Sequence, residues 1–422
     1  MQRSTYRSDR FVLIVLMFGL LGVVAASAPA TADPVVARTS DLPDVPPPQI
    51  GDPIGAAEME DLQTIASQSD MTIEQAIERY AWNETFALAI DKVRSNAPEA
   101  FTGAEIIDAH TAWVGFSGEM PQTATETLGE FHSAFADVSL DLRPGLGFTE
   151  IELERAIEAT HFAVMEQAGV LDVVTTYSFD TGRITVVVAL GQSVDAATQS
   201  RLEEAVDLSI GQSLPETIEV AVVSSGNSHL VFEDSSSYHY GGEAFSGCTS
   251  GFGTRASSET SGTRGISTAG HCGNSQTDDG DAMTFEDEYD DTHGDFQWHT
   301  GPQTESDDFY SGNSTTLETS LRDLSSVGDA VVGQSLCKNG KTSYKDCQEV
   351  RKTSVCAGNN CNLVQMGARL ADGGDSGGPV FWANTAYGLH TSWMYDPWPF
   401  NRDVYSKATR IDNALGIWVA TS

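Results

Sequence analysis

The feature that most constrains the fold is an abrupt change in the kind of sequence near residue 233. Residues 56 to about 225 are rich in helix formers and contain no cysteine. From about Glu233 onward the chain consists of Gly, Ser, Thr and short β-branched runs, and it carries all 6 cysteines. The polar stretch EDSSSYHYGG marks the change. We therefore predict a domain boundary here, with an α+β region at 56–237 and a separate region at 238–422.

The last region is expected to be all-β. Its apolar runs are short, its turns are rich in glycine, and helical periodicity is almost absent before SKATRIDNALGIWVATS. Such spacing is typical of a β-barrel or β-sandwich. A region of about 185 residues buries roughly two thirds of its surface, so it does not need disulfides to replace a missing core.

The middle region alternates helices and strands. Apolar residues recur at helical spacing in two segments, MTIEQAIERYAWNETFALAIDKV and TEIELERAIEATHFAVMEQAG. Each segment therefore predicts one amphipathic helix. DVVTTYSFDTGRITVVVAL predicts a hairpin that turns at Asp180-Thr181-Gly182, followed by a helix at TQSRLEEAVDLSIGQ and a strand at IEVAVVSS. The same order of hairpin, helix and strand occurs earlier in the chain, in EIIDAHTAWVGFSG, ATETLGEFHSAF and VSLDLRP. We therefore expect two ββαβ-type subdomains, with no catalytic cluster in either.

The first 32 residues have the layout of a secretory signal peptide. Arg3, Arg7 and Arg10 precede an apolar run at 11–26, and small residues follow. A membrane anchor is the alternative, but this run is shorter than the roughly 20 residues that span a bilayer. Cleavage after Ala32 would leave a proline-rich linker at 33–55. We expect an exported, extracellular product.

The charge balance excludes two classes of partner. Lys and Arg total 23 against 60 Asp and Glu, which gives a formal net charge of −37. A surface this acidic repels phosphate backbones and anionic lipids, so we expect neither nucleic-acid binding nor membrane docking.

The cysteines are expected to form disulfides rather than a metal site. An even number in an exported chain favours disulfides, and the spacings do not match paired zinc knuckles. Six cysteines allow fifteen pairings. Proximity in sequence favours Cys337–Cys347 and Cys356–Cys361, which leaves Cys248–Cys272.

Two segments carry the chemistry: GISTAGHCGN around His271 and ADGGDSGGPVFW around Ser376. A serine flanked by glycines can be approached closely from several directions. Its hydroxyl is a weak nucleophile at neutral pH and needs a base within hydrogen-bond reach, which in turn needs an acid to orient it. His271 can supply that base.

GDSGGP with an upstream TAGHC resembles the chymotrypsin-like serine peptidases, in particular the secreted bacterial branch of α-lytic protease and streptogrisin. The resemblance covers less than half of the chain. It implies a double six-stranded-barrel catalytic domain, Ser376 as nucleophile and His271 as general base. It also implies an oxyanion hole formed by the N–H groups of Gly374 and Ser376, with Asp375 as an internal aspartate. No cofactor is implied.

The acid of the triad is assigned to Asp295. In the family this aspartate begins a strand between the histidine and the serine, and HGDFQWHT fits that description. Asp307, Asp308 and the acidic segment 278–291 are competitors. That segment holds eight carboxylates in fourteen residues. We interpret it as a solvated acidic loop, with a calcium-binding loop as the alternative; its spacing is not that of an EF-hand, and no metal is assigned. Its charge should favour the protonated form of His271.

The same resemblance places the specificity pocket around Leu370, Ala371, Gly373, His390, Thr391 and Ser392. Leu370 stands where trypsin-like members carry an aspartate, which disfavours Arg or Lys before the cleaved bond. His390 stands where glutamate-selective relatives carry a histidine. An apolar preference remains the first expectation and glutamate the alternative.

YGGEAFSGCTSGF resembles the start of mature enzymes in this branch. Maturation is therefore expected between about Ser235 and Gly241, which makes 56–237 a propeptide that assists folding and inhibits the enzyme. Two departures from the family pattern stand out: no cysteine shortly precedes Ser376, and no buried N-terminal amine is implied.

The mature enzyme is expected to act on peptides or proteins as a monomer. The alternatives are an inactive binding protein on the same fold and a middle region that is itself the functional binding module.

Overall fold

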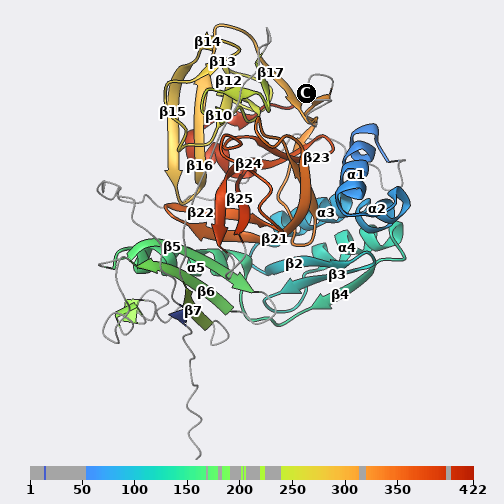
Figure 1. The fold of residues 1–422 in the computed structure, drawn as a ribbon. Helices are drawn as coiled ribbons and strands as arrows, with labels where there is room; N and C mark the ends of the chain where they lie inside the picture. The colour runs from blue at the N-terminus through green and yellow to red at the C-terminus, as the bar shows by residue number, and fades with distance from the viewer. Residues whose placement is uncertain are drawn as a thin grey trace, which may run out of the picture.

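The computed structural model describes residues 14–15, 54–167, 170–178, 183–190, 201–202, 204–205, 219–223, 239–312, 320–395 and 401–422. Figure 1 shows the helix-rich middle region lying along one side of the β-rich C-terminal region. The predicted signal peptide and linker fall outside the described residues, except for Ile14–Val15 and Ile54–Gly55. No helix among the described residues is long and apolar enough to cross a membrane.

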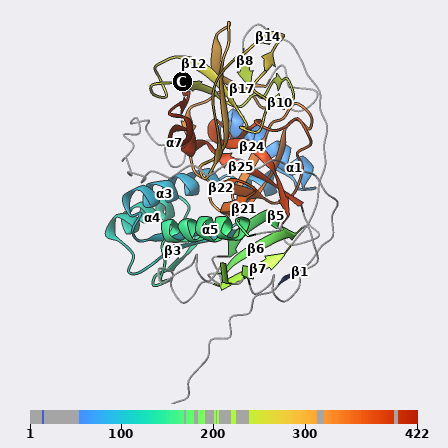
Figure 2. The same ribbon diagram turned by 90° about the vertical axis from the view of Figure 1, so that its left-hand side faces the viewer.

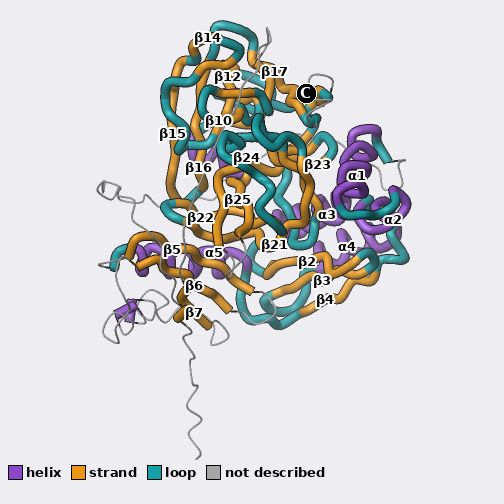
Figure 3. The backbone as a smooth tube through the Cα atoms, in the orientation of Figure 1, coloured by secondary structure: helices purple, strands orange, loops and turns teal. Residues whose placement is uncertain are grey.

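Most helices belong to the middle region, and most strands to the C-terminal region (Figure 3). The helices are Ala56–Gln68 (α1), Ile73–Tyr80 (α2), Asn83–Asn96 (α3), Gln122–Ala134 (α4), Glu150–Met165 (α5) and Ile411–Leu415 (α7), with a 3₁₀ turn at Ala408–Arg410 (η3). Before residue 239 the strands are Ile14–Val15 (β1), Phe101–Asp108 (β2), Thr111–Phe116 (β3), Ser139–Arg143 (β4), Val170–Ser178 (β5), Arg183–Leu190 (β6) and Glu219–Val223 (β7).

The C-terminal strands fall into two groups along the chain. The first group is His239–Gly241 (β8), Ala244–Phe245 (β9), Cys248–Thr249 (β10), Gly253–Arg255 (β11), Arg264–Thr268 (β12), Thr277–Asp278 (β13), Asp281–Ala282 (β14), Thr284–Asp291 (β15), Gly294–Thr300 (β16), Glu305–Tyr310 (β17), Leu321–Asp323 (β18) and Ser326–Val327 (β19). The second group is Ser335–Lys338 (β20), Asp346–Ala357 (β21), Asn360–Met366 (β22), Pro379–Trp382 (β23), Thr385–Tyr395 (β24) and Asn401–Lys407 (β25), and Trp418–Val419 (β26) returns to the first group beside β11.

The second group of strands closes on itself. Its pairing order is β21-β20-β23-β24-β25-β22, and β22 pairs again with β21. The first group forms a sheet of order β15-β16-β12-β11-β26 with smaller sheets beside it. The chain is therefore mostly β after residue 239, as the glycine-rich sequence predicts.

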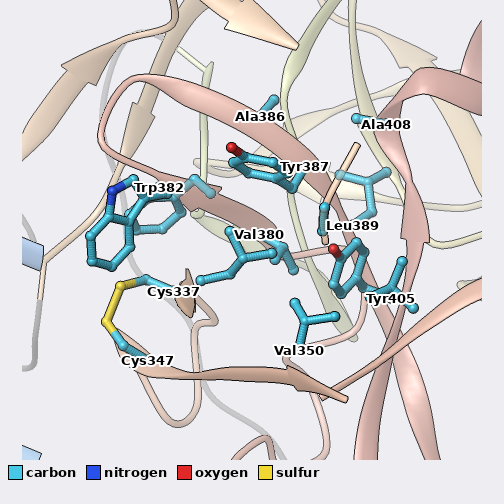
Figure 4. Close-up of a cluster of buried hydrophobic side chains, with 14 of the residues drawn as sticks. Cys337, Cys347, Val350, Val380, Trp382, Ala386, Tyr387, Leu389, Tyr405 and Ala408 are labelled. Atoms are coloured by element: carbon cyan, nitrogen blue, oxygen red, sulfur yellow. A yellow bond between two sulfur atoms is a disulfide. The ribbon is translucent and has the colours of Figure 1, made fainter. Parts of the chain in front are cut away.

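The closed ring of strands surrounds an apolar core (Figure 4). Phe381 is fully buried, and Trp382, Tyr387 and Tyr405 are each only 1% exposed. The three disulfides are Cys248–Cys272, Cys337–Cys347 and Cys356–Cys361, which confirms the pairing that sequence proximity predicts.

The middle region contains two units with the same strand order. In each, an antiparallel hairpin is followed by a strand parallel to its second member: β2 and β3 with β4, and β5 and β6 with β7. α4 connects β3 to β4, and α5 precedes the second unit. The helix predicted between β6 and β7 lies almost entirely outside the described residues.

The second unit continues the sheet of the C-terminal region. β5 pairs antiparallel with β21, so that Thr175 lies opposite Cys356, and the Gly358 N–H donates to the Val173 carbonyl at 3.1 Å. Figure 2 shows β5, β6 and β7 stacked beneath β21 and β22 in this order.

The single helix predicted over 71–93 is wrong. The helix is interrupted at Ala81–Trp82, which separates α2 from α3, because the two segments pack into different hydrophobic cores. Tyr80 of α2 packs into the core of the closed ring, whereas Trp82 and Phe86 pack with Phe131 over the sheet of β2 and β3. One straight helix could not face both.

The predicted acidic loop is also wrong as a secondary-structure assignment. Thr284–Asp291 forms β15, which pairs along its length with β16, and most of its side chains are exposed. Strand pairing satisfies the backbone, while the acidic residues of β15 remain exposed.

Candidate active site

His271 lies just beyond the end of β12, in the connection between β12 and β13. The Cys248–Cys272 disulfide fixes the next residue. A side chain at Gly270 would meet the Tyr289 carbonyl at 2.7 Å and Asp295 Oδ1 at 2.9 Å. The glycine of the TAGHC motif is thus needed because an acidic side chain packs directly against the backbone.

Asp295, His271 and Ser376 form one chain of hydrogen bonds. The His271 Nδ1–H donates to Asp295 Oδ2 at 2.7 Å, and the Ser376 hydroxyl donates to His271 Nε2 at 3.0 Å. A further bond, from the His271 backbone N–H to Asp295 Oδ1 at 2.8 Å, orients the carboxylate. Asp295 is fully buried, whereas the His271 side chain is 44% exposed. This is the arrangement in which a base can take a proton from a hydroxyl while an acid holds its tautomer.

The competing aspartates are engaged elsewhere. Asp307 pairs with Arg255 at 3.3 Å and Arg264 at 3.7 Å, and Asp308 accepts a bond from the Ser306 hydroxyl. Within the acidic segment 278–291, Asp290 is the residue that lines the cavity next to His271, but it accepts a bond from the Asn360 amide rather than from the imidazole.

Ser376 is held by a buried aspartate on its N-terminal side. Asp375 accepts bonds from the N–H groups of Asp372 at 3.0 Å and Thr342 at 2.9 Å, and it pairs with Lys338 Nζ at 3.0 Å. Burial alone would raise the pKa of Asp375, but the Lys338 charge and the bonds from the Ser343 hydroxyl and the Asp372 N–H lower it to about 2. The carboxylate is therefore ionised and anchors the loop that presents Ser376.

Lys338 is a residue that sequence reasoning did not identify. It supplies a buried positive charge opposite Asp375, with its side chain only 5% exposed. Ser406 was also not predicted: its hydroxyl accepts the Asp295 N–H at 2.9 Å and lies 2.7 Å from the Thr391 hydroxyl. Neither lies in a recognisable motif, so only the tertiary fold reveals them.

Gly374 and Ser376, the predicted oxyanion donors, lie in a loop whose shape depends on glycine. Gly374 has φ +104° and Gly377 φ +89°, conformations that side chains strongly disfavour. Among the described residues, no atom accepts a hydrogen bond from the N–H of Gly374 or of Ser376.

A cavity of about 420 Å³ opens beside the triad. Its lining includes His271, Ser376 and five of the six predicted pocket residues: Ala371, Gly373, His390, Thr391 and Ser392. Leu370 is not in the lining; its N–H donates to the buried carboxylate of Asp403 at 2.8 Å. The middle region reaches the same cavity through Val174 of β5.

The electrostatics of the two histidines at the cavity differ. Burial acts to lower the pKa of His271, but the bond to Asp295, the charge of Asp295 and that of Asp290 together raise it. Burial lowers the pKa of His390, and the charge of Asp403 only partly opposes this. His390 is therefore neutral near pH 7.

Comparison with known proteins gives similarity to solved structures only. No protein family description and no curated protein matches the chain. The chain is similar to a Nocardiopsis protease, NAPase, with 21% identity over 44% of this chain and 100% of that one, at a TM-score of 0.37. It is also similar to a glutamic-acid-specific serine protease described as using a histidine triad in substrate binding, with 25% identity over 43% of this chain and 100% of that one, at a TM-score of 0.37. Thermobifida fusca protease A gives 22% identity over 44% of this chain and 100% of that one, at a TM-score of 0.36.

Proposed function

We propose that this chain is the precursor of a secreted serine endopeptidase of the chymotrypsin-like double-barrel type. The observation that carries the proposal is the continuous hydrogen-bonded chain from Asp295 through His271 to Ser376 at the mouth of a cavity. The substrate class is a peptide or protein, and the reaction is hydrolysis of a peptide bond.

Each residue has a distinct role in this reaction. The Ser376 oxygen attacks the carbonyl carbon while His271 Nε2 takes the hydroxyl proton, and Asp295 stabilises the resulting imidazolium. The N–H groups of Gly374 and Ser376 bind the oxyanion of the tetrahedral intermediate. His271 then donates the proton to the leaving amine, which leaves an acyl-enzyme. Water, deprotonated by His271, hydrolyses that ester and restores Ser376.

The cavity favours an apolar side chain before the cleaved bond. Ala371, Met394 and Val404 line it, and the neutral imidazole of His390 offers a substrate carboxylate a hydrogen bond but no charge. Arg369, which also lines the cavity, lies 3.8 Å from Asp372 and stacks over Trp393. Glutamate is the alternative, and a panel of peptides that differ only at this residue decides between them.

The middle region acts as a propeptide in this proposal. It extends the barrel sheet through β5, and it reaches the cavity through Val174. Adding strands to an exposed sheet edge is a recognised mode of docking between protein segments. Cleavage between Ser235 and Gly241 would cut the chain that joins it to the peptidase, which is expected to be extracellular and monomeric. Mass spectrometry and N-terminal sequencing of the secreted product test the cleavage site and the removal of residues 1–32.

Covalent labelling with an organophosphonate tests the activity. The wild-type product should become labelled at Ser376 and should hydrolyse peptides, whereas Ser376→Ala should do neither. Ser325→Ala is a matched control, since Ser325 is exposed and its hydroxyl donates to the Asn384 carbonyl at 3.2 Å. Absence of label in a folded, processed product would favour the inactive binding protein. A secreted chain that stays intact and unlabelled would favour the binding-module alternative.

A further inference from the structure

A second group of acidic side chains lies apart from the triad, near the start of the C-terminal region. Carboxylate oxygens of Glu243, Asp278 and Asp279 all lie within 4.8 Å of one another. Glu243 lies between β8 and β9, and Asp278 ends β13, which pairs with β9 opposite Phe245. None of the three lines the active-site cavity.

The environment of Asp278 is what distinguishes this group from a solvated acidic patch. Asp278 is fully buried, and neither of its carboxylate oxygens has a hydrogen-bond partner among the described residues. Both Asp279 oxygens are also buried without a partner. An uncompensated buried carboxylate is strongly unfavourable, so such a group normally faces a cation or takes up a proton.

His239 is the neighbouring side chain whose positive charge acts on Asp278. His239 and Glu305 are both buried, and His239 Nδ1 lies 3.2 Å from Glu305 Oε2. A protonated His239 would therefore share one positive charge among Glu305, Asp278 and Asp279, which leaves a net negative charge on these four side chains.

The backbone explains why consecutive aspartates converge. Successive residues of a strand point to opposite faces. Asp279 leaves the strand with φ +51°, and Gly280 follows with φ +83°, so the tight turn from β13 to β14 ends that alternation. Asp278 and Asp279 can then direct their oxygens to one point, which they share with Glu243 from the neighbouring strand connection.

We propose that Glu243, Asp278 and Asp279 bind one calcium ion. Calcium takes oxygen ligands at about 2.3–2.6 Å, so ligands on opposite sides of the ion stand roughly 4.6–5.2 Å apart, in agreement with the spacing of this group. The site ties the segment that follows β8 to the hairpin that follows Cys272. It does not depend on the proposed function, although it lies only a few residues beyond the proposed maturation site.

Calcium titration of the full-length chain carrying Ser376→Ala tests this proposal, because the substitution prevents self-processing. After treatment with a chelator, isothermal titration with CaCl₂ should show one saturable site with a Kd of about 10⁻⁴–10⁻³ M, as in extracellular calcium modules. At a calcium concentration ten times Kd, the folding equilibrium constant should rise about elevenfold, which appears as a higher melting temperature. NaCl of matched ionic strength should not reproduce this rise.

Substitutions distinguish calcium binding at this site from calcium binding to other carboxylates of the chain. Asp278→Asn should abolish the saturable heat and the calcium-dependent rise in melting temperature. Asp287→Asn, on the exposed face of β15, should retain both. If Asp278→Asn fails to fold, Glu243→Gln in the same background provides the same comparison. The proposal is overturned if the parent chain shows no saturable calcium binding, if NaCl gives the same stabilisation, or if the Asp278→Asn and Asp287→Asn variants bind calcium equally.

Discussion

The contact between α1 and the C-terminal region yields the sharpest test of how the middle and C-terminal regions depend on each other. Asp61 of α1 is fully buried and accepts two bonds from the Arg322 guanidinium, both at 2.9 Å. It also accepts the Ala383 N–H at 2.7 Å and lies 2.6 Å from Lys345 Nζ. The Arg322 and Lys345 side chains are only 5% and 2% exposed.

Asp61→Asn removes the negative charge that these donors share. Glu60, which is 40% exposed, would be the remaining carboxylate within reach of both cations, at 3.1 Å from Arg322 and 3.2 Å from Lys345. Removing one partner of a buried ion pair typically costs about 3–5 kcal/mol, because the remaining charge stays buried. At about 1.4 kcal/mol per factor of ten, this lowers the folding constant of the precursor by two to nearly four powers of ten.

Urea unfolding of the full-length Ser376→Ala chain, followed by tryptophan fluorescence, measures this loss. For a slope of about 3 kcal/mol/M, the midpoint should fall by roughly 1–1.7 M. Asp70→Asn is the control, since Asp70 is exposed on the turn between α1 and α2 and has φ +53°, which asparagine tolerates. Equal midpoints for the Asp61 and Asp70 variants would refute the view that α1 is bound by a buried ion-pair network.

Two further predictions concern the active site. The raised pKa of His271 places the acidic limb of kcat/KM above the ordinary value of 6.5, because the base must be neutral and is lost as pH falls through its pKa. Asp290→Asn should move that limb to lower pH by removing a nearby negative charge; an unmoved limb in the pH–rate profile would contradict this. Gly374→Ala should reduce kcat by about 10²–10³-fold, as loss of one oxyanion donor does, because φ +104° strains alanine and displaces the N–H. An active alanine variant, measured with the same peptide substrate, would exclude that role for Gly374.

The sequence predicts those features that short segments encode. The glycines around His271 and Ser376 mark places where backbone and side chains approach closely. Such positions can be recognised from a few neighbouring residues. Alternating apolar residues and glycine-rich turns likewise predict a mostly β region. The disulfides follow from proximity because a short span between two cysteines limits the distance that their Cα atoms can reach.

Features that depend on long-range packing could not be predicted. No local sequence pattern distinguishes Lys338 and Arg322 from exposed lysines and arginines. Only the fold brings them into contact with Asp375 and Asp61. The break between α2 and α3 also escapes local periodicity, because the apolar residues on both sides fit one helical pattern while they face different cores. The family resemblance puts Leu370 in the pocket, but it does not line the cavity, and its N–H donates to Asp403.

The shared core has a consequence for activation that cleavage alone does not resolve. Leu62 and Ile65 of α1 pack in the same apolar cluster as Phe381 and Trp382 of the closed ring. Cutting one peptide bond between Ser235 and Gly241 removes none of these contacts, the Asp61 network or the β5–β21 pairing. If the proposed maturation occurs there, the severed middle region should therefore stay bound and keep Val174 at the cavity. Full activity would then require a second event that removes this region, such as further proteolysis, and it should appear later than the first cut in a time course that follows both cleavage and peptide hydrolysis.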